Sequence, residues 1–558
     1  MRSSDQRNSI ITSKRNARDK ALAFAGPYLV NDHDVYTKAT ASEIVQRIAK
    51  GEWTSSQVLE AYIARSAMAQ AETNFLYEDA RKQAKELDAE FASTKVLRGP
   101  FHGVPVSFKD QYTIEGYDAT IGFTAWANKP GTKDAFVVTQ FRAAGAIIFV
   151  KTNVPQTMFA FECSNPLWGR TTNPWNNKFT SGGSSGGEGA LLAMDGSALG
   201  IGSDIGGSLR IPASFCGIYS MKPSGERVSS FGIQGCRPGY EAIRSCLGPL
   251  ARSVEDCELF CKTIFGQKDP AHQNIPLPYQ PVELSSKLRF GYYLSDGLLE
   301  SSPACKRAVL ETVSALRKQG HECIEFASPL HTTAMEVFLG LASSDGYKKM
   351  LSYLDSDPMA ITLGPRLPSF VRNLACWITK TFLGDSLFSR FFSAAREKSV
   401  LEFTDLTDGR NKVNAAWYEQ VWDKYNFDGI IAPVQSLPAI PHGGTTYLAP
   451  LAAATIMFNV IDSPVGTIPV TRVNPDTDQL PADFVAGASG RSKMLDSRMY
   501  LGKNPVYDPK AMEGMPIGVQ IVGKRWEDEK VLAMMHVVDE ALGPRGFGPG
   551  NWTPRKTD

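Results

Sequence analysis

The chain has 558 residues, of which 43% are hydrophobic and 21% charged, a composition typical of a globular protein with a large core. Its 59 basic and 58 acidic residues give a formal net charge of +1. This balance excludes the strongly basic surface that nucleic-acid-binding proteins need, so no nucleic-acid partner is expected. No apolar run reaches the roughly 18 residues of a membrane-spanning helix. The length fits about two to four domains or one large α/β enzyme.

Cysteine usage indicates a reducing compartment without a metal site. There are nine cysteines, an odd number, and no pair has the C-x-x-C spacing. Cys257 and Cys261 lie one helical turn apart, but no second pair or nearby histidine completes a ligand set. We therefore predict mostly buried thiols, a cytoplasmic protein, no metal and no other cofactor.

The first predicted elements are helical. Residues 1–24 are basic and contain serines but lack the apolar core of a signal peptide, so residues 1–39 are predicted to form a mobile or helical arm. A mitochondrial presequence is the alternative. Residues 40–43 (TASE) and 54–57 (TSSQ) each fit a capping box before apolar residues at helical spacing, which predicts two short amphipathic helices. A charged helix follows at about 77–92.

Strands and helices then alternate along the chain. Residues 103–109 (GVPVSFK) predict a buried strand ending at Lys109, followed by a helix at 134–144 and a strand at 146–151. Residues 163–230 are dense in Gly, Ser, Asn and Pro. They predict turns and helix N-termini at a sheet edge, with a helix at 187–194 and a strand near 197–203. This alternation is typical of an α/β sheet protein.

The last third of the chain predicts further strands of the same sheet. They lie at 288–294, 427–434, 465–470 and 516–523. A closing helix at 527–542 has one apolar face, formed by Val531, Leu532, Met535 and Val538. No linker or internal repeat separates these elements, so one sheet with helical layers fits better than separate domains.

Residues 366–398 have a different pattern. Apolar residues line one helical face, stop at Gly384-Asp385 and resume, with basic residues on both sides. One interpretation is a helical hairpin packed on the core. The other is a lid over an apolar channel or a cap that touches a membrane. In the channel version the lining residues would be Phe370, Trp377, Phe382 and Phe388.

Lys109, Ser184 and Ser208 carry the strongest indication of chemistry. Ser184 and Ser208 lie in glycine-rich turns, and a lysine held neutral can serve a serine nucleophile as its base. The turn GGSSGGEGA is not a P-loop, because no Lys-Ser or Lys-Thr follows at the required spacing. These residues therefore indicate acyl transfer.

Two assignments of the nucleophile are open at this point. Residues 182–186 satisfy G-x-S-x-G, which would make Ser184 the nucleophile of an α/β-hydrolase with a downstream histidine. His442 lies in a Pro/Gly turn and His536 inside a helix, so neither histidine has a sequence context that indicates a catalytic base. The other assignment gives the attack to Ser208, with Ser184 passing its proton to Lys109.

The turn before Ser208 favours the second assignment. Gly206 and Gly207 allow consecutive N–H groups to converge on one point, which forms an oxyanion hole. Such a donor contributes roughly 3 kcal/mol to transition-state stabilisation. Lys109 ends an apolar strand, where burial lowers the pKa of a lysine and favours its neutral form.

The segment GGSSGGEGALLAMDGSALGIGSDIGGSLRIPASFCGIYSMKPS resembles the amidase signature of the serine amidohydrolases. Residues 151–175, 248–259, 459–470 and 514–533 are similar to the same family, most of all to its fungal acetamidases and fatty-acid amide hydrolases. The resemblance implies a single large domain over 40–545, with a mixed sheet of about eleven strands covered by helices on both faces. Residues 366–398 would then be an insertion and residues 546–558 a tail.

The resemblance also implies residue roles. Ser208 is the nucleophile, Ser184 the bridging serine after a cis peptide bond, and Lys109 the general base and acid. The implied oxyanion hole consists of the N–H groups of Ile205, Gly206, Gly207 and Ser208. The implied acyl pocket and substrate contacts are Met158, Phe159 and Ser185. Asp204 and Arg210 are implied to support the turn.

These roles predict hydrolysis of a small-molecule amide to an acid and an amine or ammonia through an acyl-enzyme on Ser208. Two alternatives stay open: an acyl transferase that passes the acyl group to an amine or alcohol, and a subunit of an amidotransferase. Ser203 stands where the family often has Thr, which leaves the substrate rather than the reaction open. Peripheral membrane contact through 366–398 and a homodimer are compatible with the pattern.

Overall fold

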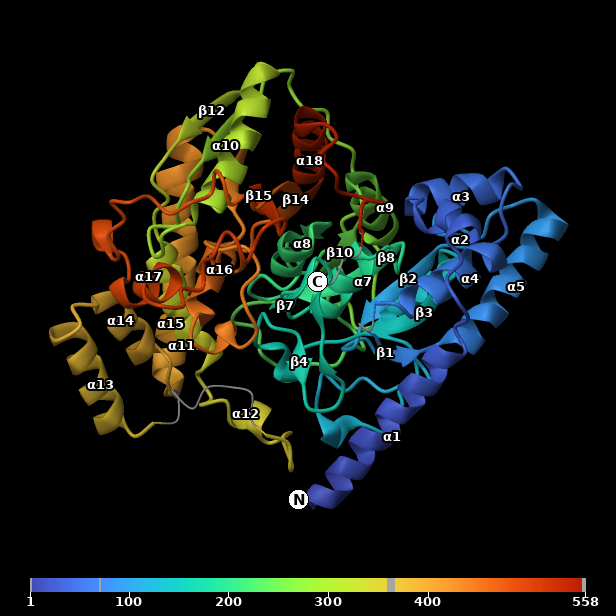
Figure 1. The fold of residues 1–558 in the computed structure, drawn as a ribbon, viewed down its shortest axis with the longest axis horizontal. Helices are drawn as coiled ribbons and strands as arrows, with labels where there is room; N and C mark the ends of the chain where they lie inside the picture. The colour runs from blue at the N-terminus through green and yellow to red at the C-terminus, as the bar shows by residue number, and fades with distance from the viewer. Residues whose placement is uncertain (1–2, 70–71, 359–366, 554–558) are drawn as a thin grey trace.

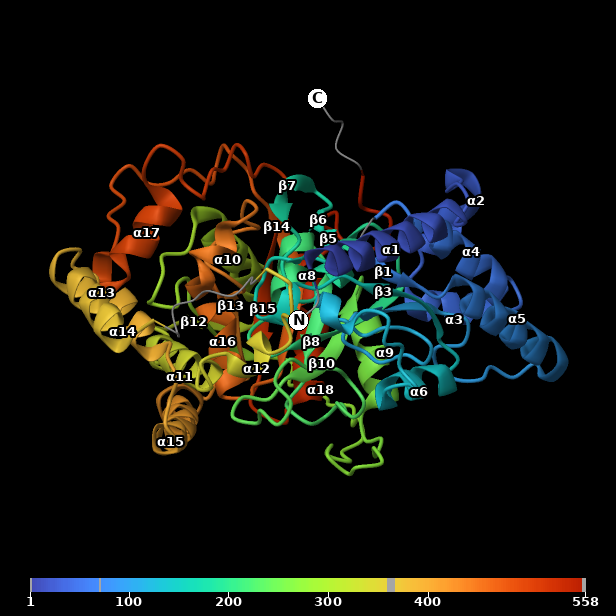
Figure 2. The ribbon, with the colours of Figure 1, turned by 90° about the horizontal axis from the view of Figure 1, so that it is seen from below.

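The computed structural model describes residues 3–69, 72–358 and 367–553. Its centre is an eleven-stranded sheet in the order β1-β3-β2-β8-β10-β9-β14-β15-β13-β11-β12. β2 runs parallel to β3 and β8, and β11 runs parallel to β12 and β13, while the remaining neighbours are antiparallel. The helices α1–α6 lie at one end of the sheet, and α10, α11 and α13–α17 lie toward the other (Figures 1 and 2). The predicted fold class is confirmed.

The strands of the central sheet are β1 (Glu72–Phe75), β2 (Pro105–Lys109), β3 (Ile147–Thr152), β8 (Leu199–Asp204), β9 (Tyr219–Lys222), β10 (Cys246–Ala251), β11 (Arg289–Tyr292), β12 (Glu322–Glu325), β13 (Gly429–Pro433), β14 (Val465–Arg472) and β15 (Pro516–Val522). Two small hairpins are formed by β4 (Ser164–Asn165) with β5 (Gly169–Arg170) and by β6 (Thr172–Asn173) with β7 (Asn176–Thr180).

The α-helices are α1 (Ser4–Ala23), α2 (Val30–Thr37), α3 (Ala41–Ala49), α4 (Ser55–Ser66), α5 (Tyr77–Thr94), α6 (Phe136–Ala143), α7 (Gly186–Ala193), α8 (Arg210–Cys216), α9 (Val254–Ile264), α10 (Pro303–Lys318), α11 (His331–Ala342), α12 (Lys348–Leu351), α13 (Ser369–Thr381), α14 (Ser386–Ala394), α15 (Val400–Trp417), α16 (Ala453–Val460), α17 (Lys493–Tyr500) and α18 (Asp528–Leu542).

Alternating side chains of the strands place helices on both faces of the sheet. On β2, Ser107 donates to Glu188 of α7, whereas the neighbouring Phe108 packs edge-on against Phe141 of α6. On β15, the Gln520 side chain donates to a backbone carbonyl of α16. The opposite face of β14 and β15 packs on α18. Lys109 follows Ser107 by two residues and therefore shares the α7 face.

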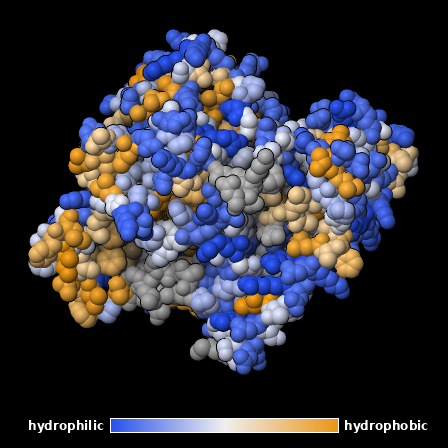
Figure 3. Space-filling view, in the orientation of Figure 1, coloured by the Kyte–Doolittle hydropathy of each residue, from blue (hydrophilic) through white to orange (hydrophobic). Residues whose placement is uncertain are grey.

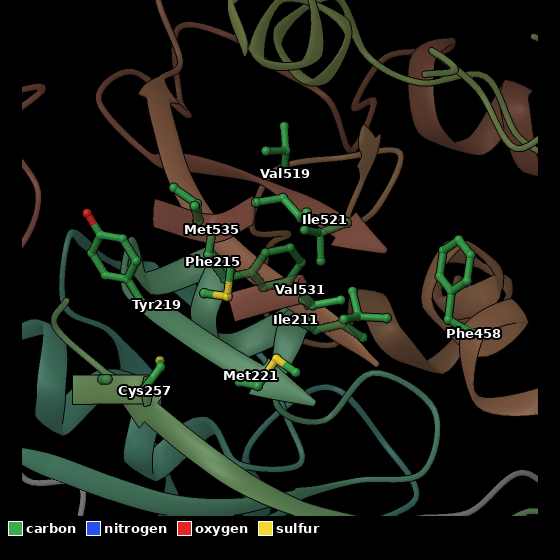
Figure 4. Close-up of a cluster of buried hydrophobic side chains, with 14 of the residues drawn as sticks. Ile211, Phe215, Tyr219, Met221, Cys257, Phe458, Val519, Ile521, Val531 and Met535 are labelled. Carbon is green, nitrogen blue, oxygen red and sulfur yellow. The ribbon is translucent and has the colours of Figure 1, made fainter. Parts of the chain in front are cut away.

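The core between α8, the sheet and α18 is continuous and apolar (Figure 4). Ile211 and Phe215 of α8, together with Met535 of α18, are almost fully buried there. The predicted apolar face of the last helix is buried over its whole length. Burial of each such side chain contributes about 1.5–3 kcal/mol, so this core fixes α8 against the sheet.

Four strands of the central sheet were not predicted from the sequence, namely β1, β9, β10 and β12. Each is short or contains residues that are uncommon in strands, such as Gly248 and Pro249 in β10.

The capping box at 54–57 is complete, because the Thr54 and Gln57 side chains each bind the other's backbone N–H. At 40–43 only half of it forms: Thr40 accepts from the Glu43 N–H, but the Glu43 carboxylate pairs with Arg47.

Residues 4–23 of the N-terminal arm form α1, which lies along the loops beside the sheet (Figure 1). Ile10 and Ile11 pack against a small cluster of Ala127, Leu167 and Trp168. Lys14 forms an ion pair of 2.7 Å with the buried Asp118, and Arg15 donates to the carbonyls of residues 166 and 167. The division into an arm, a central domain and a tail stays a prediction, and residues 554–558 of the tail lie outside the described residues.

Residues 369–394 form a helical hairpin of α13 and α14 at one end of the molecule (Figure 1). Leu387 and Phe391 of α14 are buried, and α14 packs against α11. The apolar face of α13 is exposed, with Phe370 72% and Trp377 54% accessible. Residue 366 lies outside the described residues. None of the described helices is both long and apolar enough to cross a membrane.

Replacement of Gly187 by alanine should lower the free energy of unfolding by about 2 kcal/mol or more. A Cβ atom there would lie 2.4 Å from the Asn153 nitrogen, which is backbone and cannot move aside, so α7 would be pushed away from β3. Gly235→Ala is the control, because nothing lies within 4 Å of its Cβ position, and it should change stability by less than about 0.5 kcal/mol. Urea unfolding of both variants checks this; equal midpoints would contradict the close approach of α7.

Candidate active site

The three sequence-predicted residues come from neighbouring elements. Lys109 is the last residue of β2, and Asp204 ends the parallel neighbour β8, so both lie at the same edge of the sheet. Ser184 precedes α7, after a cis peptide bond between Gly183 and Ser184. Ser208 lies in the turn between β8 and α8. The Ser185 N–H donates to the Ser208 carbonyl at 3.3 Å, which ties the two glycine-rich turns together.

Lys109 is fully buried and contacts two hydroxyl groups. Its Nζ lies 2.6 Å from Ser184 Oγ and 2.9 Å from Ser203 Oγ. Burial lowers the pKa of Lys109 to about 7, against the opposing effect of the negative charge on Asp204. At neutral pH a large fraction of this amine is therefore unprotonated and can accept a proton.

A second buried titratable group, Glu188, lies on α7 close to Lys109. Its carboxylate accepts hydrogen bonds from Ser107 Oγ at 2.5 Å and Thr152 Oγ1 at 2.7 Å. Burial raises the pKa of Glu188 to about 8, although both hydroxyl groups act in the opposite direction. A protonated Glu188 at neutral pH carries no charge that would favour the ammonium form of Lys109.

The turn that carries Ser208 is held by a buried ion pair. Both guanidinium nitrogens of Arg210 that face Asp204 lie 3.0 Å from its carboxylate oxygens, and both side chains are fully buried. Burial raises the pKa of Asp204, but the Arg210 charge and Asn459 outweigh it and hold this pKa well below its usual range. Asp204 is therefore ionised at neutral pH.

The same carboxylate orders the backbone of the turn. The Gly207 N–H donates to Asp204 Oδ1 at 2.8 Å and the Leu209 N–H donates to Asp204 Oδ2 at 3.1 Å. Gly207 has a φ of +125°, which only glycine adopts without strain. Ser185 adds a further link, because its Oγ donates to the Ser203 carbonyl at 3.3 Å. Ser185, Asp204 and Arg210 thus all hold the turn.

Met158 and Phe159 directly precede residues 160 and 161, whose backbone atoms lie 2.9–3.1 Å from the position of a Cβ atom on Gly183. Thr157 and Met158 both have positive φ, and the Thr157 carbonyl accepts from the Cys236 thiol at 3.0 Å. The side chains of Met158 and Phe159 are partly exposed and pack on one apolar cluster. Its buried members are Ile121, Phe123, Val154, Cys236, Tyr347 and Met350.

Apolar side chains also border the turn at Gly206. A Cβ atom on Gly206 would lie 3.4 Å from Ile456 of α16 and 3.4 Å from the Phe338 ring of α11. The Thr455 hydroxyl donates to the Gly206 carbonyl at 2.7 Å and fixes its direction. The space beside Gly206 is therefore bounded by hydrocarbon from two helices that lie far away in the sequence.

The two histidines of the alternative assignment are engaged elsewhere. His442 pairs with Glu162 and its Nε2 lies 2.9 Å from the Asn177 carbonyl. His536 on α18 pairs with Glu255 and Glu258. Neither histidine bonds to Ser184 among the contacts of the described residues. In that same part of the chain, no group of His, Cys, Asp and Glu side chains is arranged to hold a metal ion.

Sequence reasoning missed several residues that complete the site. Gln111 accepts from Ser203 Oγ at 2.7 Å, and Asn459 donates to Asp204 at 2.8 Å. Gln520 of β15 accepts from Arg210 at 3.2 Å. Asn459 and Gln520 lie more than two hundred residues from the turn, and no local motif marks them. Gln111 follows Lys109 by two residues, so its position on the same face of the chain is a signal that the sequence does contain.

Comparisons with known proteins identify the family of this chain. The family model described as Amidase matches residues 57–532. Acetamidase of Emericella nidulans is 32% identical over 91% of this chain and 90% of its own length, and fatty-acid amide hydrolase 1 of Sus scrofa is 32% identical over 92% and 87%. A solved fatty acid amide hydrolase has a TM-score of 0.79 at 26% identity, covering 98% of this chain and 92% of that chain. The chain therefore belongs to the amidase signature family and is a hydrolase that acts on amide C–N bonds.

Proposed function

We propose that the protein hydrolyses amides through an acyl-enzyme on Ser208, with Ser184 as the proton bridge and Lys109 as the base. The observation that carries this proposal is the 2.6 Å contact between a fully buried lysine Nζ and Ser184 Oγ. Burial brings the pKa of Lys109 to about 7, so the amine accepts and returns a proton at neutral pH.

In the acylation step, Ser208 Oγ attacks the amide carbonyl carbon. Its proton passes to Ser184, whose own proton passes to Lys109, and the carbonyl oxygen becomes an oxyanion. Lys109 then returns the proton through Ser184 to the amide nitrogen, the C–N bond breaks, and the amine leaves. Protonation of the nitrogen is needed because an amide anion is a very poor leaving group. Water repeats the sequence to release the acid.

Backbone N–H groups of the turn would stabilise the oxyanion. Those of Ile205, Gly206, Gly207 and Ser208 are the proposed donors. The Gly207 N–H already donates to Asp204 at 2.8 Å, so it can contribute only a shared hydrogen. The main part of this stabilisation therefore comes from the N–H groups of Ile205, Gly206 and Ser208. Each well-placed donor contributes about 3 kcal/mol.

The apolar surroundings favour a hydrophobic acyl group. Met158 and Phe159 rest on one apolar cluster, and Phe338 and Ile456 border Gly206. An acyl chain placed there would bury its surface at about 25 cal/mol per Å². We propose an amide of an apolar carboxylic acid as the substrate class.

Ser208→Ala should lower kcat for an acyl-length series of amides by on the order of 10⁴-fold, because no acyl-enzyme can form. Ser184→Ala should also lose most of the rate while Ser208 stays labelled by a fluorophosphonate. His442→Ala and His536→Ala serve as controls and should keep both activity and labelling. Retained activity in Ser208→Ala, together with labelling lost in Ser184→Ala, would move the nucleophile to Ser184.

The pH dependence of kcat/KM should show one acid limb near pH 7. The amine of Lys109 must be neutral to accept a proton, so activity should rise with pH through about 7 in proportion to the neutral fraction and then level off. The test uses an uncharged amide substrate, so that only enzyme groups titrate. Lys109→Met should remove the limb together with the activity; a wild-type profile that is flat from pH 5 to about 9 would contradict the proposed base.

We further propose that α13 contacts a membrane surface. Its exposed apolar residues gather at the lower left of Figure 3, at the place of α13 in Figure 1. The rings of Trp377 and Phe382 lie 5.2 Å apart at this surface, and Arg372 and Lys380 on the same helix supply positive charge for anionic headgroups.

The variant Trp377→Ser/Phe382→Ser should bind less to vesicles of phosphatidylcholine with phosphatidylserine. Each lost ring removes about 1.5 kcal/mol or more of insertion energy, which is about tenfold in the partition coefficient. Leu401→Ser on α15 is the matched control, since Leu401 is 71% exposed but lies outside the hairpin. Cosedimentation measures all three proteins, and equal binding would rule out α13 as the contact.

A further inference from the structure

Besides its contact with Ser184, Lys109 begins a second, equally buried hydrogen-bond chain. Lys109 Nζ donates to Ser203 Oγ at 2.9 Å, and Ser203 Oγ donates to Gln111 Oε1 at 2.7 Å. All three side chains are shielded from water, with Gln111 2% and Ser203 5% exposed. None of the steps derived above uses Ser203 or Gln111 directly.

The direction of these bonds follows from the proton count. A serine hydroxyl has one proton, and the carbonyl oxygen of a glutamine can only accept. Because Ser203 gives its proton to Gln111, it can only accept from Lys109. A neutral amine has two N–H bonds and one lone pair. Once one N–H is committed to Ser203, the lone pair is free to face Ser184 at 2.6 Å.

The opposite arrangement would be inactive. A neutral Lys109 that donated an N–H to Ser184 would leave the Ser184 proton without an acceptor, and the relay from Ser208 could not proceed. We propose that Gln111, acting through Ser203, is a positioning residue that sets the direction of the proton relay by orienting the lone pair of Lys109 toward Ser184. This inference rests on the proposed roles of Ser208, Ser184 and Lys109.

The backbone holds this chain of groups in place. The Gln111 carbonyl accepts from the Gln234 N–H at 2.8 Å, and the Ser203 N–H donates to Ser185 Oγ at 3.4 Å. These bonds do not involve the Gln111 side chain or the Ser203 hydroxyl. Substitutions at the two side chains therefore alter the polarity of the relay while the anchoring bonds of the backbone stay.

The first test compares Ser203→Ala with Ser203→Thr. Ser203→Ala should lower kcat by on the order of 10²-fold with little change in KM, because a Lys109 lone pair that points away from Ser184 cannot accept the Ser184 proton. It should also move the acid limb of the rate profile to lower pH, since the ammonium form loses an acceptor. Ser203→Thr keeps the hydroxyl group and should restore both kcat and the wild-type limb.

The second test uses Gln111→Leu. Without the acceptor, the Ser203 proton turns to the lone pair of Lys109, which opposes protonation of the amine. Gln111→Leu should therefore lower kcat and shift the acid limb to lower pH. The double variant Gln111→Leu/Ser203→Ala should be no slower than Ser203→Ala alone, because Gln111 acts through the Ser203 hydroxyl.

Controls separate this inference from the proposed function. The final extent of fluorophosphonate labelling and the thermal midpoint report whether each variant is folded. If Ser208→Ala is inactive but Ser203→Ala and Gln111→Leu keep the wild-type kcat and acid limb, the positioning role is wrong and the proposed function stands. Additive losses in the double variant would also overturn it. If Ser208→Ala is fully active, the proposed function itself fails.

Discussion

The ion pair between Asp204 and Arg210 is the constraint on which the site depends. Both side chains are fully buried, and the same Arg210 guanidinium also donates to the Thr455 carbonyl and to Gln520. Removal of one partner of a buried pair typically costs about 3–5 kcal/mol, because the other charge is left uncompensated. Through this pair, β8, α8, α16 and β15 meet at one point, and the turn with Ser208 cannot move independently of the sheet.

The same pair decides the charge state around Lys109. An ionised Asp204 near a buried lysine favours the ammonium form, yet burial prevails and the pKa of Lys109 falls to about 7. Arg210 compensates the Asp204 charge at 3.0 Å, and burial raises the pKa of Glu188 to about 8, so this carboxyl is largely neutral at pH 7. Lys109 thus has hydroxyl groups as its bonded partners instead of a carboxylate, which suits a lysine that works in its neutral form.

Much of the fold could be predicted because its strands carry strong apolar patterns. The strand ending at Lys109 and the last helix were placed to within about two residues of their observed bounds. β1 (ETNF) and β12 (ECIE) were missed, because each has only four residues and begins with a glutamate, which leaves too short a stretch for a clear apolar alternation. At the site, the short G-x-S-x-G pattern pointed to Ser184, whereas the glycine turn before Ser208 and the family resemblance favoured Ser208 as the nucleophile. Asn459 and Gln520 could not be found, since only the folded chain brings them to Asp204.

The site has two parts, and different interactions stabilise each of them. The turns around Lys109 and Ser208 are fixed by buried charges and by strands of the central sheet. The proposed surfaces for the acyl group come from Met158, Phe159 and the apolar cluster that contains Tyr347 and Met350, and apolar packing holds them in place. Packing of this kind tolerates exchange of similar side chains far better than a buried ion pair tolerates loss of a partner. We therefore expect that acyl preference can change at these side chains without disturbing the proposed proton relay; relatives of this chain are named for substrates as different as acetamide and fatty-acid amides.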